Sequence, residues 1–565
     1  MADQSVDYYF EDTTSLDQTD DFDGSSYSES SPSSRGSNEE EILQSGHLGT
    51  SEFRFSASLG STNTRDMIMS YARSAVRELV EMARCDAPLW KLSDEVPNTS
   101  NLNLAEYYQV FRPMDPNLEN PRKKARMRLP SYAASKETSC INIRPARLAA
   151  SFMDLKEWST IFASIVSGAD ILAVVSPGTH GTLDEATYLM TAEFHLPTTM
   201  VQSGASSFVR HCRMLGMHSW AITDFSVENL FPNEVYTYQI RPSGCLIESR
   251  PGRSSKVTVV QHYKEDNASL HHLYAPIVAS GHAFCAKRWM QALTRTLEFT
   301  SHHNTPQSIA FKRDGDLCEF QRKGLMRLCE RMLRAFFGEV NGSTTNSWRP
   351  VPLCGGNPLE LMMNRCGVHI LGNVEADSLA FSTSVFLPFP PLKVFEFLRD
   401  STRRHKWDPL SKEEDMEEIA AMHTARDVRN KITIVRSKNG GKSPYFIENS
   451  FYTAMESYLV RAGIQPDSMG DILRGNSPDD VLILPSGFAI LPSKPPVGDE
   501  HGEDRTLLTI AIQSNHEGRT QWNPAPRIDE LEFNLLVMSE TIQRIERGLA
   551  AKERAGSRRG RLHIG

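Results

Sequence analysis

The chain contains two copies of one short pattern. Residues 240–247 read IRPSGCLI and residues 483–490 read ILPSGFAI, so each has a Pro-Ser-Gly turn within an apolar run. A β-rich segment follows each turn, at 255–263 and 506–513, and a long helical segment comes after it. Because self-similarity in a fixed order is typical of a repeated supersecondary unit, the pattern predicts two copies of one α+β module.

The segments that precede each turn also match in kind. Residues 152–166 and 394–410 are both helical in pattern, carry a Trp and lead into strand and turn material. The helix of the first copy opens with Pro276, which is favourable in a first turn. Its apolar positions recur at four-residue spacing, at Cys285, Trp289, Leu293 and Leu297. We therefore expect each module to end in a long amphipathic helix.

The closing helix of the second copy has a heptad pattern over residues 528–549. Its apolar positions alternate steps of three and four, at Ile528, Leu531, Leu535, Met538, Ile542, Ile545 and Leu549. Such a pattern is either the seam of a dimeric coiled coil or the face of a helix that packs over its own sheet. Three heptads without a clear charge pattern at the flanking positions favour the second interpretation.

The first 60 residues differ in composition from the rest. They hold 14 Ser and 13 acidic residues against Arg35 and Arg54, a net charge of −11, whereas the whole chain of 565 residues carries −9. With so few aliphatic residues this acidic tail is expected to be disordered. An amphipathic helix is expected from about Arg65, and the length suggests two to four domains at about 150 residues each. The near-neutral remainder excludes a globally basic coat for nucleic acid.

Signatures of enzymes and metal sites are not found in the sequence. The G-x-S-x-G, H-E-x-x-H and G-x-G-x-x-G motifs are absent. Residues 439–443 resemble the end of a phosphate-binding loop, but Arg436 stands where that motif needs its first glycine, so a turn is expected. The paired histidines at 271–272 and 302–303 have no acidic or Cys partner at ligand spacing. We expect a binding protein that uses neither metal nor cofactor.

Cysteine usage, hydropathy and the first residues indicate the cellular compartment that we expect for the chain. The nine cysteines never form C-x-x-C, which is typical of reduced intracellular thiols. The apolar runs, such as residues 171–175, are far shorter than the roughly 18 residues of a membrane span. The acidic start of the chain is unlike a secretory signal.

A basic cluster lies within the Pro-flanked loop 113–145. It consists of Arg122, Lys123, Lys124, Arg126 and Arg128. Such a run is typical of a nuclear import signal or a phosphate-binding patch, and an ordinary solvated loop is the alternative. We favour the nuclear signal.

Several motifs together resemble a known family. Residues 271–293 are similar to the helix that closes the START lipid-binding domain in plant class IV homeodomain-leucine zipper (HD-ZIP IV) transcription factors. Further START motifs occur in the family's order at 79–90, 103–107, 152–158 and 255–263, and residues 384–411 and 481–492 resemble its START-adjacent domain. The resemblance covers about residues 65–550, and the agreement of many motifs in order makes it highly specific.

The resemblance implies a fold and a domain layout. We expect two tandem helix-grip, START-like modules, in each of which a curved antiparallel sheet surrounds a long C-terminal helix. The START module would enclose an apolar cavity for one sterol or phospholipid. The expected segments are a disordered tail (1–60), a START domain (65–305), a linker helix (306–350), a START-adjacent domain (351–550) and a basic tail (551–565).

One departure from the family affects the expected function. No Trp in the chain is followed by Phe, as the DNA-reading helix of a homeodomain requires, and no zipper precedes the START motifs. We therefore expect a nuclear, lipid-binding regulator of transcription that acts through protein partners, including full-length relatives, without contacting DNA directly. The alternatives are a cytoplasmic lipid carrier and a complete DNA-binding member of the family of which this sequence is only a part.

Five residues are candidates for contact with a lipid. Arg210, Glu248 and His262 are the polar candidates, and Arg210 is expected to pair with Glu248, since a charge inside an apolar cavity needs a partner. Trp220 and Trp289 are the aromatic candidates for the cavity wall. For each polar candidate the alternative is a side chain that faces solvent or a neighbouring strand.

Overall fold

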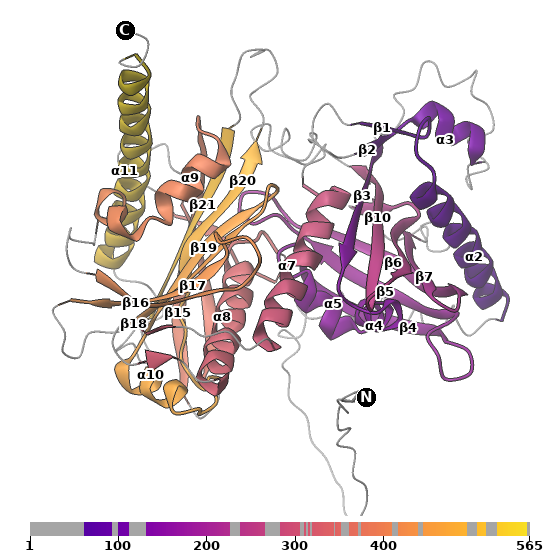
Figure 1. Cartoon of the computed structure of the whole chain (residues 1–565), viewed down its shortest axis with the longest axis horizontal. Coiled ribbons are helices and arrows are strands. Elements are labelled where there is room, and N and C mark those ends of the chain that lie inside the picture. Colours follow the sequence, from indigo (N-terminus) through magenta and orange to yellow (C-terminus); the bar gives the residue numbers. More distant parts are fainter. Residues whose placement is uncertain are drawn as a thin grey trace, which may run out of the picture. The chain divides into compact units, whose positions relative to one another are not determined.

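The computed structural model describes most of the chain. The described residues are 62–92, 100–111, 132–226, 238–265, 283–304, 310–311, 315–316, 319–343, 345–351, 361–370, 374–409, 416–438, 445–493, 505–515 and 528–561. The acidic tail and the basic cluster at 122–128 lie outside them. Two large antiparallel sheets contain nearly all of the described strands (Figure 1).

The first sheet has ten strands. They are β1 (Trp90–Leu92), β2 (Ser100–Leu102), β3 (Tyr132–Ile141), β4 (Val166–Pro177), β5 (Ala186–Phe194), β6 (Gly204–Gly216), β7 (Ser219–Ser226), β8 (Tyr238–Ile240), β9 (Ser243–Arg250) and β10 (Ser254–Glu265). Their order is β1-β2-β3-β10-β9-β7-β6-β5-β4, and β8 pairs with β10. All pairs in this sheet are antiparallel. The strands β4 to β7 and the pair β9 and β10 are neighbours both in the chain and in the sheet, so they form hairpins.

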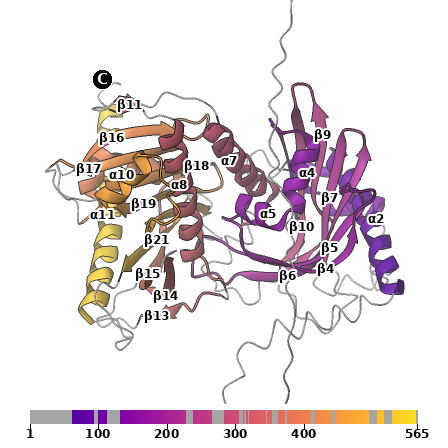
Figure 2. The same ribbon diagram turned by 90° about the horizontal axis from the view of Figure 1, so that it is seen from below.

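Helices cover both faces of the first sheet. They are α2 (Thr62–Arg84), α3 (Leu104–Val110), α4 (Pro145–Met153), α5 (Leu155–Ile161) and α7 (Ala286–Asn304). Side chains alternate between faces along a strand. Val209 of β6 therefore packs with Ile68 and Ala72 of α2, whereas the preceding Phe208 packs in the core that includes Trp289 of α7. We call the α7 side the inner face (Figures 1 and 2).

The second sheet has nine strands. They are β13 (Arg349–Pro350), β14 (Met362–Ile370), β15 (Val374–Leu387), β16 (Met416–His423), β17 (Lys431–Ser437), β18 (Tyr445–Tyr452), β19 (Ser457–Ile464), β20 (Ser486–Ser493) and β21 (Arg505–Asn515). Their order is β13-β14-β15-β21-β20-β19-β18-β17-β16. A separate two-stranded sheet pairs β11 (Ala310–Phe311) with β12 (Gly315–Asp316).

Helices also cover both faces of the second sheet. They are α8 (Glu319–Glu339), α9 (Pro391–Leu398), α10 (Pro466–Leu473) and α11 (Ile528–Arg561), with a 3-10 helix, η4 (Ser401–Lys406). Leu325 and Met332 of α8 pack with Ile434 on one face, and Met538 of α11 packs with Phe381 on the other. The expected linker segment thus contains α8, which contributes to the core of the second sheet.

The two sheets repeat one topology. The order β3-β10-β9-β7-β6-β5-β4 corresponds strand for strand to β15-β21-β20-β19-β18-β17-β16. Helices α4 and α5 precede the first series of hairpins as α9 and η4 precede the second, and α7 and α11 follow their sheets. The predicted duplication of one α+β helix-grip module is confirmed.

The Pro-Ser-Gly turns explain why the short pattern recurs. Each turn leads into the strand before the last, β9 or β20. A Cβ on Gly244 would lie 2.0 Å from the carbonyl oxygen of Ile222, and one on Gly487 would lie 2.3 Å from that of Leu459. Both glycines therefore let a neighbouring strand approach more closely than any side chain permits.

The heptad of α11 packs over its own sheet. Met538, Ile542, Ile545 and Leu549 are buried in the core between α11 and the second sheet, and we call this side the inner face of that sheet. Phe533 and Leu536 of the same helix are more than half exposed. The preferred interpretation of the pattern is confirmed. Helix α11 continues to Arg561, so most of the expected tail 551–565 is helical.

Candidate functional site

The inner face of the first sheet carries a small cavity beside α7. Its volume is about 30 Å³, close to the share of one liquid water molecule. The aromatic lining residues are Phe152, Trp158, Phe162, Phe194 and Trp289. The rings of Phe162 and Trp289 lie 4.8 Å apart, and Trp158 stacks on Trp289 at 6.4 Å. Aromatic side chains thus occupy the space that a helix-grip fold can offer to a ligand.

Arg210 lies against this cavity on the inner face of β6. Its side chain is 2% exposed, and its guanidinium lies 4.1 Å from the centre of the Trp158 ring. Nε and Nη2 donate to the two carboxylate oxygens of Asp224 at 2.8 and 2.7 Å, and Nη1 donates to the carbonyl of Phe152 at 2.9 Å. A bidentate pair of this kind is the geometry that makes a buried charge tolerable.

The predicted pairing of Arg210 with Glu248 is wrong. Glu248 is partly exposed and pairs instead with Arg84 at 3.3 Å and Lys256 at 3.8 Å. Asp224 takes its place because β6 and β7 are adjacent and their register sets Arg210 directly opposite Asp224. Glu248 lies on β9, beyond β7.

The other predicted residues are divided between the cavity and its surroundings. Trp289 lines the cavity, as Arg210 does. Trp220 is buried in the same core without lining the cavity, and the ring of His262 meets that of Tyr107 of α3 edge-on at 5.2 Å. Burial, with a smaller contribution from Arg241, lowers the pKa of His262 to about 3. This histidine is therefore neutral at physiological pH.

Sequence reasoning did not single out three polar side chains that line the cavity, Asp224, Ser243 and Gln261. Ser243 belongs to the Pro-Ser-Gly turn and Gln261 to the β-rich segment 255–263, whereas Asp224 belongs to no motif noted in the sequence. Ser243 is the register partner of Asp224 across β7 and β9. The Pro-Ser-Gly turn was therefore a signal that pointed to the base of the cavity.

Two buried thiols of the first module have raised pKa values. Burial raises the pKa of Cys212 to about 12 and that of Cys285 to about 11, so both remain protonated thiols. Within the described ranges no cluster of His, Cys, Asp and Glu could hold a metal ion, and the side chains of His302 and His303 lie outside them. No helix in the described part of the chain is long and apolar enough to cross a membrane.

Two family models match the chain. The START domain model matches residues 70–298, and the model of the PDF2-like, C-terminal domain matches residues 319–551. Among solved structures the chain is similar to human STARD10 at 13% identity, covering 40% of this chain and 80% of that one with a TM-score of 0.27. It is also similar to human StAR-related lipid transfer protein 5 at 12% identity, covering 42% and 99% with a TM-score of 0.28.

Similar proteins come from plants. Homeobox-leucine zipper protein HDG3 of Arabidopsis thaliana is 33% identical over 459 residues, which is 80% of this chain and 61% of that protein. GLABRA 2 of Arabidopsis thaliana is 29% identical over 511 residues, 86% of this chain and 66% of that protein. ROC4 of Oryza sativa subsp. japonica is 28% identical over 512 residues, which is 86% of this chain and 62% of that protein. The chain thus spans just under two thirds of the length of these relatives. The chain carries a START domain and a PDF2-like C-terminal domain, and the relatives that it resembles over most of its length are HD-ZIP IV proteins.

Proposed function

We propose that this chain is a lipid-binding regulator of transcription that works in the nucleus through protein partners. The observation that carries the proposal is the inner cavity of the START domain, where an aromatic wall meets the buried Arg210–Asp224 pair. Apolar walls with a few fixed polar groups are typical of small-molecule sites. The regulatory role is supported by the relatives, which are named homeobox-leucine zipper proteins.

Lipid entry requires the aromatic wall to rearrange. A cavity of about 30 Å³ cannot hold an acyl chain or a sterol. A lipid that hides ~400 Å² of apolar surface gains on the order of 10 kcal/mol at ~25 cal/mol/Å². Part of this free energy offsets the cost of displacing Trp289 and its aromatic neighbours. The remainder stabilises the bound form.

Ligand binding would then act on the abundance and contacts of the protein. A ligand at a hundredfold excess over its Kd stabilises the folded state by about 2.7 kcal/mol. A shift of that size changes protein levels in cells several-fold. Dimerisation with full-length relatives, or competition for their partners, would carry the signal to DNA.

Native mass spectrometry of the full chain tests lipid binding. We expect a co-purified lipid at one per chain, and we expect Gln261→Trp to remove it, because Gln261 lines the cavity and is only partly buried. The matched control is Gln239→Trp on the neighbouring β8, outside the cavity lining. An empty protein that binds no sterol, sphingolipid or phospholipid on titration would contradict lipid binding.

A fluorescent fusion tests the nuclear role. The full-length fusion should accumulate in nuclei, and changing Lys123 and Lys124 to Ala should reduce that accumulation. Exclusion of the unchanged fusion from nuclei would contradict the regulatory role and favour a cytoplasmic lipid carrier.

A further inference from the structure

The second module has a larger cavity at the place that corresponds to the START cavity. Its volume is about 320 Å³, within the roughly 300–1,000 Å³ typical of small-molecule pockets. In the paired strands, Ile222, Cys245 and Val259 of the first cavity correspond in register to Leu459, Phe488 and Ile510 of the second. The duplicated topology has therefore placed both cavities on the same inner face.

The closing helices explain the difference in size. Helix α7 presents the indole of Trp289 to the first cavity, where it packs among other rings. Helix α11 presents Val537 and Thr541 to the second, and these side chains leave space that an indole would fill. The larger volume thus follows from the smaller residues of α11.

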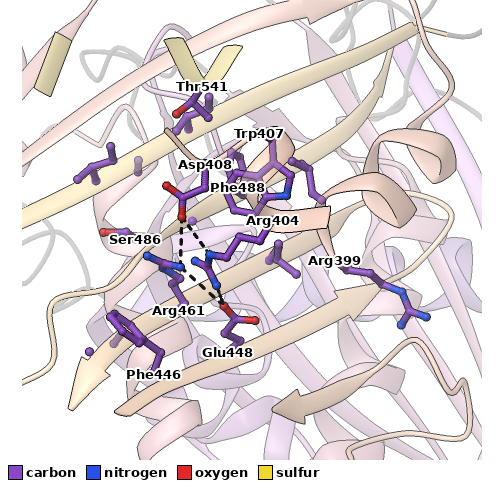
Figure 3. Close-up of a pocket in the computed structure, with 18 of the residues that line it drawn as sticks. Arg399, Arg404, Trp407, Asp408, Phe446, Glu448, Arg461, Ser486, Phe488 and Thr541 are labelled. Atoms are coloured by element: carbon purple, nitrogen blue, oxygen red, sulfur yellow. Dashed lines mark hydrogen bonds and ion pairs between the residues drawn. The ribbon is translucent and has the colours of Figure 1, made fainter. Parts of the chain in front are cut away.

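Four charged residues form one wall of the second cavity (Figure 3). Nε of Arg404 is 3.0 Å from Asp408, and its Nη1 donates to Glu448. Arg461 lies 3.7 Å from Asp408 and 3.8 Å from Glu448. Two positive and two negative side chains therefore balance within the wall. Arg399 also lines the cavity, and its charge is paired with Glu396 at 3.0 Å. An anion placed beside them would lack a counter-charge of its own.

Two lining residues carry a buried donor that finds no acceptor among the described residues. The donors are Nη2 of Arg404 and Nε1 of Trp407, which lie behind the cavity surface, and the two residues are only 6% and 7% exposed. Both groups can donate only. Most other lining residues are apolar, among them Leu398, Phe446, Leu459, Phe488 and Ile510. A ligand with one hydrogen-bond acceptor would satisfy these donors after a turn of either side chain toward the cavity, and donors of this kind are costly to leave unpaired.

We propose that the PDF2-like domain binds a neutral amphipathic small molecule in this cavity. Its apolar body would face the lining from β18–β21 and α11, and its hydroxyl or carbonyl oxygen would accept from Arg404 and Trp407. The cavity has the volume of about ten liquid water molecules at ~30 Å³ each, which suits an apolar body of roughly ten carbon atoms. This site is separate from the START cavity and does not depend on lipid binding there.

Calorimetric titration of the full chain with decan-1-ol and with decanoate tests the proposal. We expect one molecule of decan-1-ol per chain, and decanoate about tenfold weaker or more, because the wall already balances its charges. Trp407→Phe removes the Nε1 donor and should weaken decan-1-ol binding about two- to tenfold. Trp348→Phe, the same change outside both cavities, should leave it unaltered.

A substitution that fills the cavity locates the probe. Gly463 lines the cavity, and a Cβ there would meet only the Phe446 ring, at 3.5 Å, which is an ordinary contact. Gly463→Leu should therefore fold and abolish binding of decan-1-ol, and Val537→Phe provides a second, independent block.

Four results would overturn the proposal, and the first three concern the second cavity. They are no binding of decan-1-ol to the unchanged protein, equal binding of decanoate, and binding that survives both cavity-filling variants. Loss of binding in Gln261→Trp alone would place the probe in START and would also overturn it. None of these results decides whether START carries a lipid of its own, which the co-purification experiment measures.

Discussion

Arg288 of α7 and Glu456, in the turn between β18 and β19, form an ion pair that joins the two modules. Nε of Arg288 lies 2.9 Å from the Glu456 carboxylate, and both side chains are 1% exposed. The same carboxylate accepts from Ser164 and Tyr458 at 2.9 Å. The helix that closes the START cavity is thus bonded to the second sheet, so a ligand that moves α7 acts on this contact.

Removal of one partner from this pair should destabilise the protein strongly. Glu456→Gln leaves the buried Arg288 without its counter-charge and should lower the free energy of unfolding by about 3–5 kcal/mol. Urea denaturation measures the loss. Glu330→Gln, which breaks the exposed pair with Arg334, should change the free energy of unfolding by less than about 1 kcal/mol. Equal effects of the two variants would contradict the role of the buried pair.

The carboxylate of Glu456 predicts that the free energy of unfolding depends on pH. Burial alone would raise the pKa of Glu456, but Arg288 and Arg295 outweigh it and hold the pKa below its ordinary value of 4.5. The stabilisation is therefore complete above pH 4.5 and is lost as the pH falls through the lowered value. Unfolding free energies measured across this range should fall more steeply for the unchanged protein than for Glu456→Gln. Parallel curves would contradict the assignment.

Buried histidines predict a second loss of stability at milder acidity. Burial, as the main cause, lowers the pKa of His195 to about 4 from the ordinary 6.5. Below pH 6.5 the unfolded chain binds a proton that the folded chain does not, so stability falls by about 1.4 kcal/mol per pH unit for this residue. His195→Gln should reduce the loss between pH 7 and 5 by about 2 kcal/mol. A loss that His195→Gln does not reduce would contradict the role of this buried histidine.

The glycine of the second Pro-Ser-Gly turn should tolerate no side chain. In Gly487→Ala the new Cβ would meet backbone atoms of β19, which cannot move aside as a side chain can. We expect a loss of at least about 3 kcal/mol in urea denaturation, or failure to fold. Gly338→Ala in α8 meets no atom within 4 Å and should raise stability by about 0.5–1 kcal/mol. A mild effect at Gly487 would contradict the close approach of the strands.

Helix α11 offers a matched pair of substitutions. Ile545 is fully buried against the second sheet, so Ile545→Ala should cost about 2–5 kcal/mol of stability. Leu536 is 63% exposed, and its change to Ala should cost less than about 0.5 kcal/mol. Light scattering should give the same mass for both variants and the unchanged protein. A smaller mass for Ile545→Ala would indicate that the heptad forms an interface between chains.

Local patterns in the sequence predicted the fold more fully than the site. The Pro-Ser-Gly turns and the helix at 528–549 carry their meaning within a few residues, and both predictions are confirmed by the sheets and by α11. The buried arginine of the START cavity was also identified. Its partner was not, because Asp224 becomes its neighbour only through the register of β6 and β7.

The second cavity was missed for the same physical reason. Arg404 and Glu448 are 44 residues apart, and their contact depends on the packing of η4 against β18. The repeat itself held a usable signal, since Ser243 and Ser486 occupy equivalent turns. In the second sheet Ser486 pairs with Arg461, and Arg461 pairs in turn with Glu448. In the first sheet Ser243 pairs with Asp224, and Asp224 pairs in turn with Arg210.

That equivalence has a consequence for folding. Asp224 faces Arg210 in the first module, whereas at the same register Arg461 faces Glu448 in the second, so the charges are exchanged. A chain with two copies of one sheet risks pairing a strand with the wrong copy while it folds. Pairing β6 with β19 would oppose Arg210 to Arg461, and pairing β18 with β7 would oppose Glu448 to Asp224. Like charges repel across such pairs, so each copy preferentially pairs with its own strands.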